Sequence, residues 1–246
     1  MYTDIHTHIL HDVDDGPSTI SEAIKLLELS VLEGTENIIA TPHFYASHHR
    51  LKEHLELINS RFEELVVMAK QTFPNVNFIL GMEVRYFNGI SKSDVLELLC
   101  FKNTNTILLE LGYEPINDKI IFEIKELYYN GFNVILAHIE RYYKFKGFSK
   151  LKELIDKGFV KAQLSASALF EHHFKRATVK LIKDGYITFV ASDMHSTEHR
   201  PPRLKEAFEF IKNKFGEDIS IRFIKNSFLL FEDMNKREAE VKDVLF

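Results

Sequence analysis

The sequence predicts an α/β fold in which seven parallel strands close into a TIM-like (β/α)7 barrel. Seven short segments are almost continuously apolar, as strands buried on both faces are. Each is followed by a helical pattern, and this alternation is typical of a parallel sheet covered on both faces. Seven such units fall one short of the usual eight. An open doubly wound sheet is the alternative, but the chain has no Gly-rich dinucleotide-binding loop.

The expected elements are spread over most of the chain. Strands are predicted at residues 4–8, 37–41, 77–80, 106–110, 133–137, 160–164 and 187–191. Helices are predicted at residues 20–34, 51–70, 93–102, 118–131, 149–157, 200–216 and 219–234.

Capping residues mark several of these helix boundaries. Thr19 and Glu22 have the spacing of a capping box, and Gly34 is expected to end the helix that follows them. Asp118 is expected to cap the helix at residues 118–131. Arg200-Pro-Pro is expected to open a helix, since proline is tolerated in the first turn.

Composition limits the classes of protein that this chain can be. Of its 246 residues 45% are hydrophobic and 27% are charged, which supplies enough apolar side chains for a sizeable core. The net charge of -5, with both signs interleaved, argues against nucleic-acid binding and against a basic membrane-binding patch. No apolar run approaches a membrane span, no signal peptide precedes the first strand, and a single cysteine excludes an intramolecular disulfide. A cytoplasmic protein is the simplest interpretation.

Side chains that can bind metal stand at the carboxyl end of six of the seven predicted strands. The first strand ends in His6 and His8, which lie on one side of an extended chain. The full set, with Asp15 in the first turn, is His6, His8, Asp15, His43, Glu83, Glu110, His138, Asp193 and His195. In a parallel barrel these ends meet on the face where active sites lie. Because clustered buried carboxylates would repel one another without cations, the set predicts a polynuclear metal site.

The ligand types and two arginines indicate the chemistry of this site. Histidine and carboxylate ligands without cysteine suit Mn, Fe or Zn, and nine ligands are too many for one ion. Two ions close together can clamp the attacking and leaving oxygens of an in-line displacement, and a third would use the remaining ligands. Arg141 and Arg200 follow predicted ligands, and their planar guanidinium groups suit phosphate oxygens. Arg85 is expected to form a salt bridge behind Glu83.

Seven motifs carry a resemblance to a known family. Between Asp4 and residue 203 they are DIHTHIL, DVDDGP, ATPHF, GMEVRY, LLELG, AHIERY and SDMHS. The set is similar to the PHP (polymerase and histidinol phosphatase) superfamily and, within it, to the manganese-dependent bacterial tyrosine phosphatases of the CpsB/YwqE type. This resemblance implies a distorted seven-stranded barrel of the PHP fold, formed by residues 1–246 as a single domain. The end of the sixth strand, Ser165-Ala-Ser-Ala168, lacks the glycine expected in that family.

The resemblance also implies three divalent metal ions, of which Mn²⁺ is expected and Fe or Zn are alternatives. By motif, the first ion would bind His6, His8, Glu83 and Asp193, the second Glu83, Glu110 and His138, and the third Asp15, His43 and His195. Arg141 and Arg200 fall where that family binds phosphate, and we expect both to serve in substrate binding and in catalysis.

The implied activity is that of a metal-dependent protein-tyrosine phosphatase, in which a metal-bridging hydroxide attacks phosphorus. The implied partners are phosphotyrosine proteins or peptides, in particular the tyrosine-rich tails of bacterial kinases that control capsular and exported polysaccharide. Histidinol-phosphate phosphatase is the alternative, with the same fold and chemistry. A third hypothesis is a PHP binding module that has lost catalysis, but such a module should lack ligands and this sequence lacks none. The sequence is compatible with an oligomer.

Overall fold

Parallel strands form the centre of the computed structural model, which describes the backbone of residues 1–244 and the side chains of residues 1–237. The strands are β1 Tyr2–Thr7, β2 Thr35–Ala40, β3 His43–Phe44, β4 Asn77–Leu80, β5 Glu83–Arg85, β6 Thr106–Glu110, β7 Asn133–Leu136, β8 Val160–Ser165 and β9 Phe189–Ala191. They form a three-stranded sheet in the order β1-β2-β4 and a six-stranded sheet in the order β3-β5-β6-β7-β8-β9. Every pairing is parallel.

The second and third predicted strands are each divided into two pieces. Pro42, which has no N–H to donate, lies between β2 and β3. Hydrogen bonds bridge the interruption, because the N–H of Gly81 donates to the carbonyl of Ala40 at 2.8 Å and the N–H of Glu83 to that of Pro42 at 3.0 Å. The pairs β2–β3 and β4–β5 therefore act as two kinked strands that run through both sheets.

Two further hydrogen bonds close the ring between β9 and β1. The N–H of Asp193 donates to the carbonyl of His6, and the N–H of His8 donates to that of Met194, both at 3.0 Å. Seven strands thus follow one another around a closed and distorted ring, which confirms the predicted (β/α)7 barrel.

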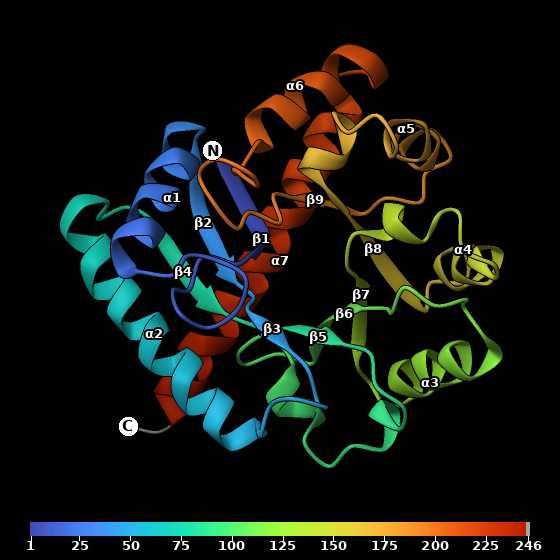
Figure 1. Ribbon diagram of the computed structural model, residues 1–246, viewed down its shortest axis with the longest axis horizontal. Helices are drawn as coiled ribbons and strands as arrows, with labels where there is room; N and C mark the ends of the chain where they lie inside the picture. The colour runs from blue at the N-terminus through green and yellow to red at the C-terminus, as the bar shows by residue number, and fades with distance from the viewer. Residues whose placement is uncertain (245–246) are drawn as a thin grey trace.

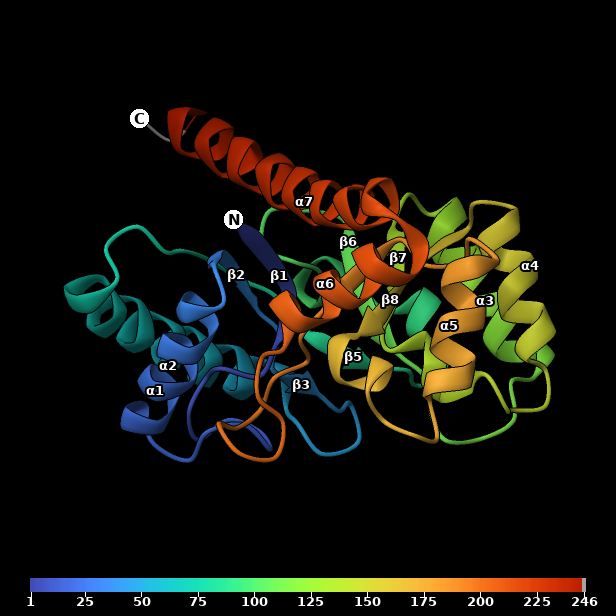
Figure 2. The same ribbon diagram turned by 90° about the horizontal axis from the view of Figure 1, so that it is seen from above.

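Helices surround the ring (Figure 1). They are α1 Ile20–Leu32, α2 Leu51–Thr72, α3 Asp118–Tyr129, α4 Phe148–Asp156, α5 Lys175–Lys183, α6 Leu204–Phe215 and α7 Glu217–Val244. Figure 2 shows α7 crossing the end of the barrel at which the strands begin, opposite the loops that follow β1, β3 and β9. Across the part of the chain that the structure describes, no helix has both the length and the apolar character needed to cross a membrane.

The last helix, α7, closes the end of the barrel at which the strands begin, here called its floor (Figure 2). Phe231 and Met234 of α7 are each 1% exposed. They pack in the same core cluster as inward-facing strand residues, among them Ile5, Leu108 and Phe189. The predicted helix at residues 219–234 is therefore confirmed, and its apolar face covers the floor of the barrel.

The helix predicted at residues 93–102 is wrong. The structure has two short 3-10 turns in this region, Ile90–Lys92 and Leu96–Leu99. The backbone N–H groups of Phe101 and Lys102 donate to the carbonyls of Thr106 on β6 and Leu80 on β4, at 2.8 and 3.0 Å. Because both strands bind the end of the segment, its backbone leaves helical geometry before Lys102.

Two other helix starts differ from the prediction. Asn117, and not Asp118, is the N-cap of α3, since its side chain accepts a hydrogen bond from the N–H of Ile120 at 3.0 Å. The helix expected from residue 200 begins at Leu204, because Arg203 before it has a left-handed backbone with φ of 87°.

The predicted cap of α1 is confirmed in part. The side chain of Thr19 accepts a hydrogen bond from the N–H of Glu22 at 3.2 Å. The Glu22 carboxylate, however, accepts from the N–H of Ser18 at 2.8 Å and not from that of Thr19. The reciprocal half of the capping box is therefore displaced by one residue.

Candidate metal centre

All nine residues predicted to bind metal lie at the end of the barrel where the strands finish. Strands β1, β3, β5 and β6 carry four of them, and the other five lie on the segments that directly follow β1, β7 and β9. Eight are at most 9% exposed, whereas the side chain of Asp15 is 60% exposed. The barrel thus brings together side chains that are up to 189 residues apart in the chain, from His6 to His195.

The carboxylate of Glu83 lies at the centre of the cluster. Its Oε2 is 3.1 Å from Nε2 of His6, from Nε2 of His8 and from Nδ1 of His43. Its Oε1 is 2.7 Å from Nε2 of His138. Oε2 is buried and has no aligned hydrogen-bond donor among the described residues. One oxygen surrounded by three imidazole nitrogens in this way suits a carboxylate that bridges metal ions.

Three of the imidazoles are oriented from outside the cluster. In each of His6, His8 and His195, the Nδ1 atom faces an oxygen that accepts hydrogen bonds and cannot donate them. These acceptors are Oε1 of Gln163 at 3.2 Å, Oδ2 of Asp14 at 2.7 Å and the carbonyl of Asp193 at 2.9 Å. A neutral ring that donates from Nδ1 carries its lone pair on Nε2, on the side of the cluster.

When the rings are neutral, these lone pairs would repel one another without a cation. The Nε2 atoms of His6 and His8 are 3.1 Å apart, and Nε2 of His195 is 3.1 Å from Oδ1 of Asp15. A divalent cation between such donor atoms replaces repulsion with coordination. The donor set therefore fits divalent metal ions.

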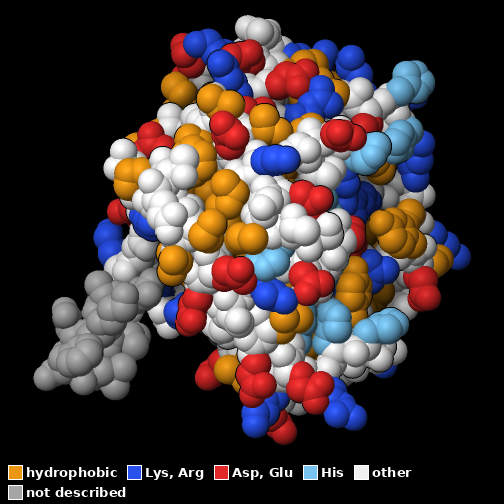
Figure 3. Space-filling model, turned by 60° about the vertical axis from the view of Figure 1, so that its left-hand side comes forward, with side chains coloured by type: hydrophobic (Ala, Val, Ile, Leu, Met, Phe, Trp, Pro, Cys, Tyr) orange, Lys and Arg blue, Asp and Glu red, His pale blue; other side chains and the backbone are white. Residues whose placement is uncertain are grey.

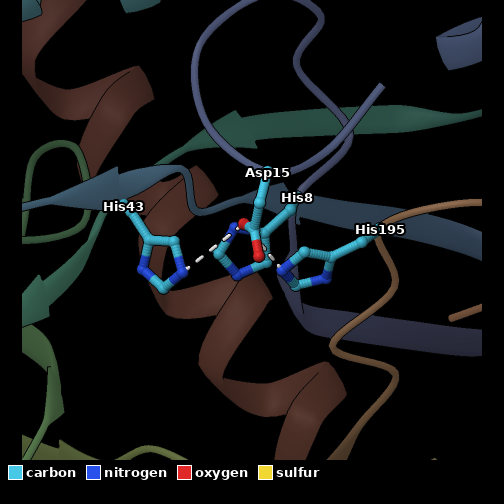
Figure 4. A group of neighbouring side chains, drawn as sticks. All are labelled: His8, Asp15, His43 and His195. Carbon is cyan, nitrogen blue, oxygen red and sulfur yellow. Dashed lines mark ion pairs between the residues drawn. The ribbon is translucent and has the colours of Figure 1, made fainter. Parts of the chain in front are cut away.

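Four of the predicted ligands form a group toward the mouth of the site, namely His8, Asp15, His43 and His195. Within this group Asp15 lies between His43 and His195 (Figure 4). Oδ1 of Asp15 is 3.6 Å from Nε2 of His43, and the ring of His8 stacks on that of His195 with centroids 3.9 Å apart. The loop that carries Asp15 packs tightly on the segment after β1, and a Cβ at Gly16 would overlap with the carbonyl oxygen of His8.

Three groups of side chains are close enough for each to hold an ion. They are His8, Asp15, His43 and His195; His6, His8 and Asp193; and His43, Glu83 and Glu110. His138 is outside these groups, although its Nε2 is 3.5 Å from Oε1 of Glu110 as well as close to Glu83. The groups overlap with the ligand sets implied by the resemblance, and the assignment of each ligand to one ion stays a prediction.

Burial and neighbouring charges set the protonation of the cluster. Burial lowers the pKa of His43 and of His138 to about 4, so both rings are neutral at neutral pH and offer a lone pair. Burial also acts to lower the pKa of His8, but Asp14 and Glu83 outweigh it and raise this pKa to about 10. Binding of a metal ion to His8 therefore releases a proton.

Two arginines meet at Asp193. Nη2 of Arg141 and Nη2 of Arg200 are 2.9 and 2.8 Å from Oδ2 of this residue. The hydroxyl of Ser165 donates to the same oxygen at 3.1 Å. Burial acts to raise the pKa of Asp193, but the charges of His6, Arg200 and Arg141 hold it well below its usual range. Asp193 thus links the predicted metal site to the predicted phosphate-binding arginines.

Two of the predicted ligands have a strained backbone. His138 and Asp193 have φ values of 33° and 55°, in the left-handed region that residues other than glycine seldom adopt. Each is the second residue after a strand ends, β7 at Leu136 and β9 at Ala191, and its side chain lies in the cluster. Such conformations cost about 1–3 kcal/mol each and persist where the surrounding structure enforces them, often at functional sites.

A cavity of about 240 Å³, here called the metal pocket, opens from the cluster to the surface. Its lining residues are Asp15, His43, Tyr45, Glu83, Arg85, Glu110, Tyr113, Arg141, Asp193 and Arg200. Arg85 forms its salt bridge with Glu110, at 2.7 Å, and not with Glu83 as predicted. The reason is the strand register, which pairs Arg85 of β5 with Glu110 of β6. The guanidinium of Arg85 also lies over the ring of Tyr113, 5.4 Å from its centroid.

Sequence reasoning missed three side chains that orient the site. Asp14 binds His8, Ser165 binds Asp193, and Oε1 of Gln163 accepts from the N–H of His138 at 2.7 Å. Gln163 and Ser165 alternate on the otherwise apolar end of β8, and this polar alternation is a signal that the sequence offered. Asp14 and Asp15 are neighbours, and no pattern in the sequence separates their roles.

Comparisons with known proteins find similarity over nearly the whole chain. Residues 2–231 match the family described as capsular polysaccharide synthesis, CpsB/CapC. The tyrosine-protein phosphatase CpsB of Streptococcus agalactiae is 30% identical over 240 residues, which cover 91% of this chain and 96% of that protein. The tyrosine-protein phosphatase YwqE of Bacillus subtilis is 26% identical over 239 residues, which cover 94% and 91%.

A solved structure shares the fold. It belongs to a study of YwqE from Bacillus subtilis and CpsB from Streptococcus pneumoniae, described as metal-dependent tyrosine phosphatases. The TM-score is 0.78 at 24% identity, over 94% of each chain. The similarity therefore extends over nearly the whole barrel and its helices.

Proposed function

This chain belongs to the CpsB/CapC family, and we propose that it is a metal-dependent phosphomonoesterase that removes phosphate from phosphotyrosine in proteins. The observation that carries the proposal is the meeting of a buried histidine–carboxylate cluster with two arginines at Asp193. A metal site alone would serve many kinds of hydrolase. Paired guanidinium groups beside it suit a phosphoryl group in particular.

The cluster supports more than one metal ion. We propose three divalent ions, with Mn²⁺ preferred over Fe or Zn, held by the nine residues predicted from the sequence. Ions bound there would neutralise phosphoryl charge and supply a nucleophile that is active at neutral pH. Asp14 and Gln163 hold imidazole rings with Nε2 directed inward, so the donor atoms need little rearrangement to bind.

Arg141 and Arg200 are in position to bind the phosphoryl group. Both line the metal pocket, and their side chains are 21% and 36% exposed, so part of each guanidinium faces the opening. Their shared contact with Asp193 holds the two groups side by side before substrate arrives. Such preorganised donors stabilise the charge on the equatorial oxygens as the bond to the leaving oxygen breaks.

An aromatic ester fits the mouth of the pocket. Tyr45 and Tyr113 both line it, and Tyr113 is 67% exposed, so its ring is available to pack against a substrate ring. A tyrosyl phenolate, with a pKa of about 10, also leaves with less protonation than an aliphatic alkoxide requires. These features favour phosphotyrosine over histidinol phosphate.

The chemistry is tested with protein from which metal has been removed. We expect hydrolysis of p-nitrophenyl phosphate and of a phosphotyrosine peptide to appear with added Mn²⁺ and to vanish with EDTA. Full activity of the metal-free protein in excess EDTA would overturn the proposal. Elemental analysis of protein purified without chelator tests the noncatalytic alternative, which requires that no transition metal is found.

The substrate is tested by comparing kcat/KM for a phosphotyrosine peptide and for histidinol phosphate. A strong preference for histidinol phosphate would overturn the proposal of a phosphotyrosine substrate and assign the chain to histidinol-phosphate hydrolysis. The family takes its description from capsular polysaccharide synthesis. We therefore further propose that the natural substrates are the tyrosine-rich tails of the kinases that control this synthesis. Phosphorylated tail peptides from the same organism are the direct test.

A further inference from the structure

We infer that a groove along α5 binds an acidic segment next to the phosphotyrosine of the protein substrate. This inference rests on the proposed function and adds a preference among phosphotyrosine proteins. The groove, here called the basic groove, has a volume of about 970 Å³. Six cations line it, namely Lys144, Lys175, Arg176, Lys180, Lys183 and Lys214, together with the single carboxylate of Asp184.

The charge of the groove contrasts with that of the whole chain. The net charge of the protein is -5, yet the nine residues of α5 include four cations and no acid. On the face that carries α1 and α2, acidic and basic side chains are interspersed (Figure 3). A concentration of one sign on an otherwise acidic protein creates a local field that attracts a ligand of the opposite sign.

Most of these cations have no acidic partner. Lys180 pairs with Asp184 at 2.9 Å. No carboxylate of the described residues lies within 4.0 Å of the charged group of any of the other five. Glu171 beside the groove faces His173 at 3.4 Å. The buried side of α5 is apolar, with Ala177, Leu181 and Ile182 at most 4% exposed, so its cations are all on the outer face.

Neighbouring cavities lead from the basic groove to the proposed active site. A cavity of about 410 Å³, here called the middle pocket, lies between the two. It shares Tyr113 and Arg141 with the metal pocket, and it shares Tyr143, Lys144, His173 and Ala177 with the basic groove. A peptide whose phosphotyrosine reaches Arg141 can therefore continue through the middle pocket into the basic groove.

The lining of this path fits a peptide. Phe145 and Phe174 line the middle pocket, so an apolar side chain can be buried beside the phosphotyrosine. Its one carboxylate, Glu140, is 2% exposed, so almost none of it faces a ligand in the pocket. The nine residues of α5 extend over about 13 Å, the length of about four residues of extended peptide. The acidic residues of the substrate should thus lie within a short stretch on one side of the phosphotyrosine.

Charge reversal in the basic groove tests the inference. The variant Lys175→Glu, Arg176→Glu, Lys183→Glu changes three exposed side chains that have no ion-pair partner among the described residues and leaves the metal pocket intact. The substrates are a phosphotyrosine peptide with acidic neighbours, the same peptide with Asn and Gln in place of Asp and Glu, and p-nitrophenyl phosphate. We expect KM for the acidic peptide to rise about tenfold or more, with little change for the other two substrates.

A matched variant controls for net charge. Lys25→Glu, Lys225→Glu, Lys236→Glu changes three exposed lysines on α1 and α7, away from the groove, and should leave the three KM values unchanged. For the native protein, the preference for the acidic peptide should also fall as the salt concentration rises. Equal KM values for the acidic and neutral peptides, or an equal loss on all three substrates in the groove variant, would overturn the inference.

A direct binding measurement separates this inference from the proposed activity. Fluorescence anisotropy with the unphosphorylated acidic peptide reports on the groove even if the protein proves inactive as a phosphatase. Loss of binding in the groove variant alone supports the groove, whereas no binding by the native protein contradicts it. Binding of phosphatidylserine vesicles that depends on the three cations, with peptide kinetics unchanged, would assign the groove to a membrane surface instead.

Discussion

His8 and Asp14 are joined by a hydrogen bond of 2.7 Å between the imidazole Nδ1 and a carboxylate oxygen. The same oxygen accepts from the backbone N–H of His43 at 3.0 Å, so one side chain orients two predicted ligands. Burial acts to raise the pKa of Asp14, but the charge of His8 holds it well below its usual range. An anionic Asp14 thus keeps a proton on Nδ1 of His8, so that Nε2 is the nitrogen that loses its proton and binds metal.

Replacement of Asp14 should therefore weaken metal binding. Asp14→Asn keeps the size of the side chain but removes the charge that orients and polarises His8. We expect the affinity for Mn²⁺ to fall about 10–100-fold, with activity partly restored by excess metal. Titration of metal-free protein with Mn²⁺ measures this. Asp12→Asn on the same loop, which removes only an exposed ion pair to Arg61, is the control, and equal affinities for the two variants would contradict the role of Asp14.

Replacement of either arginine at Asp193 should affect catalysis more than metal content. We expect Arg141→Ala and Arg200→Ala each to lower kcat/KM about 10²–10³-fold, the usual loss when a preorganised donor to a developing charge is removed. Lysine should restore little, because a point charge cannot reproduce the planar fork of a guanidinium group.

The matched control for these variants is Arg50→Ala, since Arg50 forms an exposed pair with Glu53. Metal content is measured in parallel, because each arginine also neutralises the buried Asp193. Turnover close to that of the native protein in both alanine variants, with unchanged metal content, would mean that the phosphoryl group binds elsewhere.

The metal-binding residues could be predicted from the sequence because all the strands of a parallel barrel run in the same direction. Parallel strands place their carboxyl ends on one face, so His6, Glu83 and Asp193 meet although they are far apart in the chain. The supporting side chains could not be found in this way. Asp14 rather than Asp15 reaches His8 because of the path of a loop, and Arg85 pairs with Glu110 because of strand register.

For the fold, too, the overall architecture was predictable from the sequence, whereas several local features were not. Apolar strands alternating with helices specify a barrel, whereas the kinks after β2 and β4 and the loss of the helix at residues 93–102 depend on hydrogen bonds between distant segments. Asn117 and Asp118 are both able to cap a helix, and the residue types alone do not decide between them.

Glu140 should make the stability of the protein depend on pH. It is 2% exposed, and burial raises the pKa of its carboxyl from 4.5 to about 7. A raised pKa in the folded state means that the full stability is present below about pH 4.5 and is lost as the pH rises through about 7. This loss amounts to roughly 3 kcal/mol for such a difference in pKa.

Glu140→Gln removes this titration with little change of shape. We expect the free energy of unfolding, measured with urea and EDTA at pH 5.5 and pH 8, to fall less between these values in the variant. Part of the pH dependence should remain, because burial also raises the pKa of Asp4 to about 6. The same difference between pH 5.5 and pH 8 in both proteins would show that Glu140 does not titrate in this range.

Phe231 should stabilise the whole barrel from its floor. It is 1% exposed and packs with inward-facing strand residues such as Ile5 and Ile39, so truncation leaves a cavity that the surrounding strands cannot easily fill. We expect Phe231→Ala to lower the free energy of unfolding by about 3–5 kcal/mol. Phe228→Ala, on the same helix but 38% exposed, should cost less than about 1 kcal/mol. Urea denaturation measures both, and equal losses would mean that α7 contributes through its helical structure alone and does not seal the barrel.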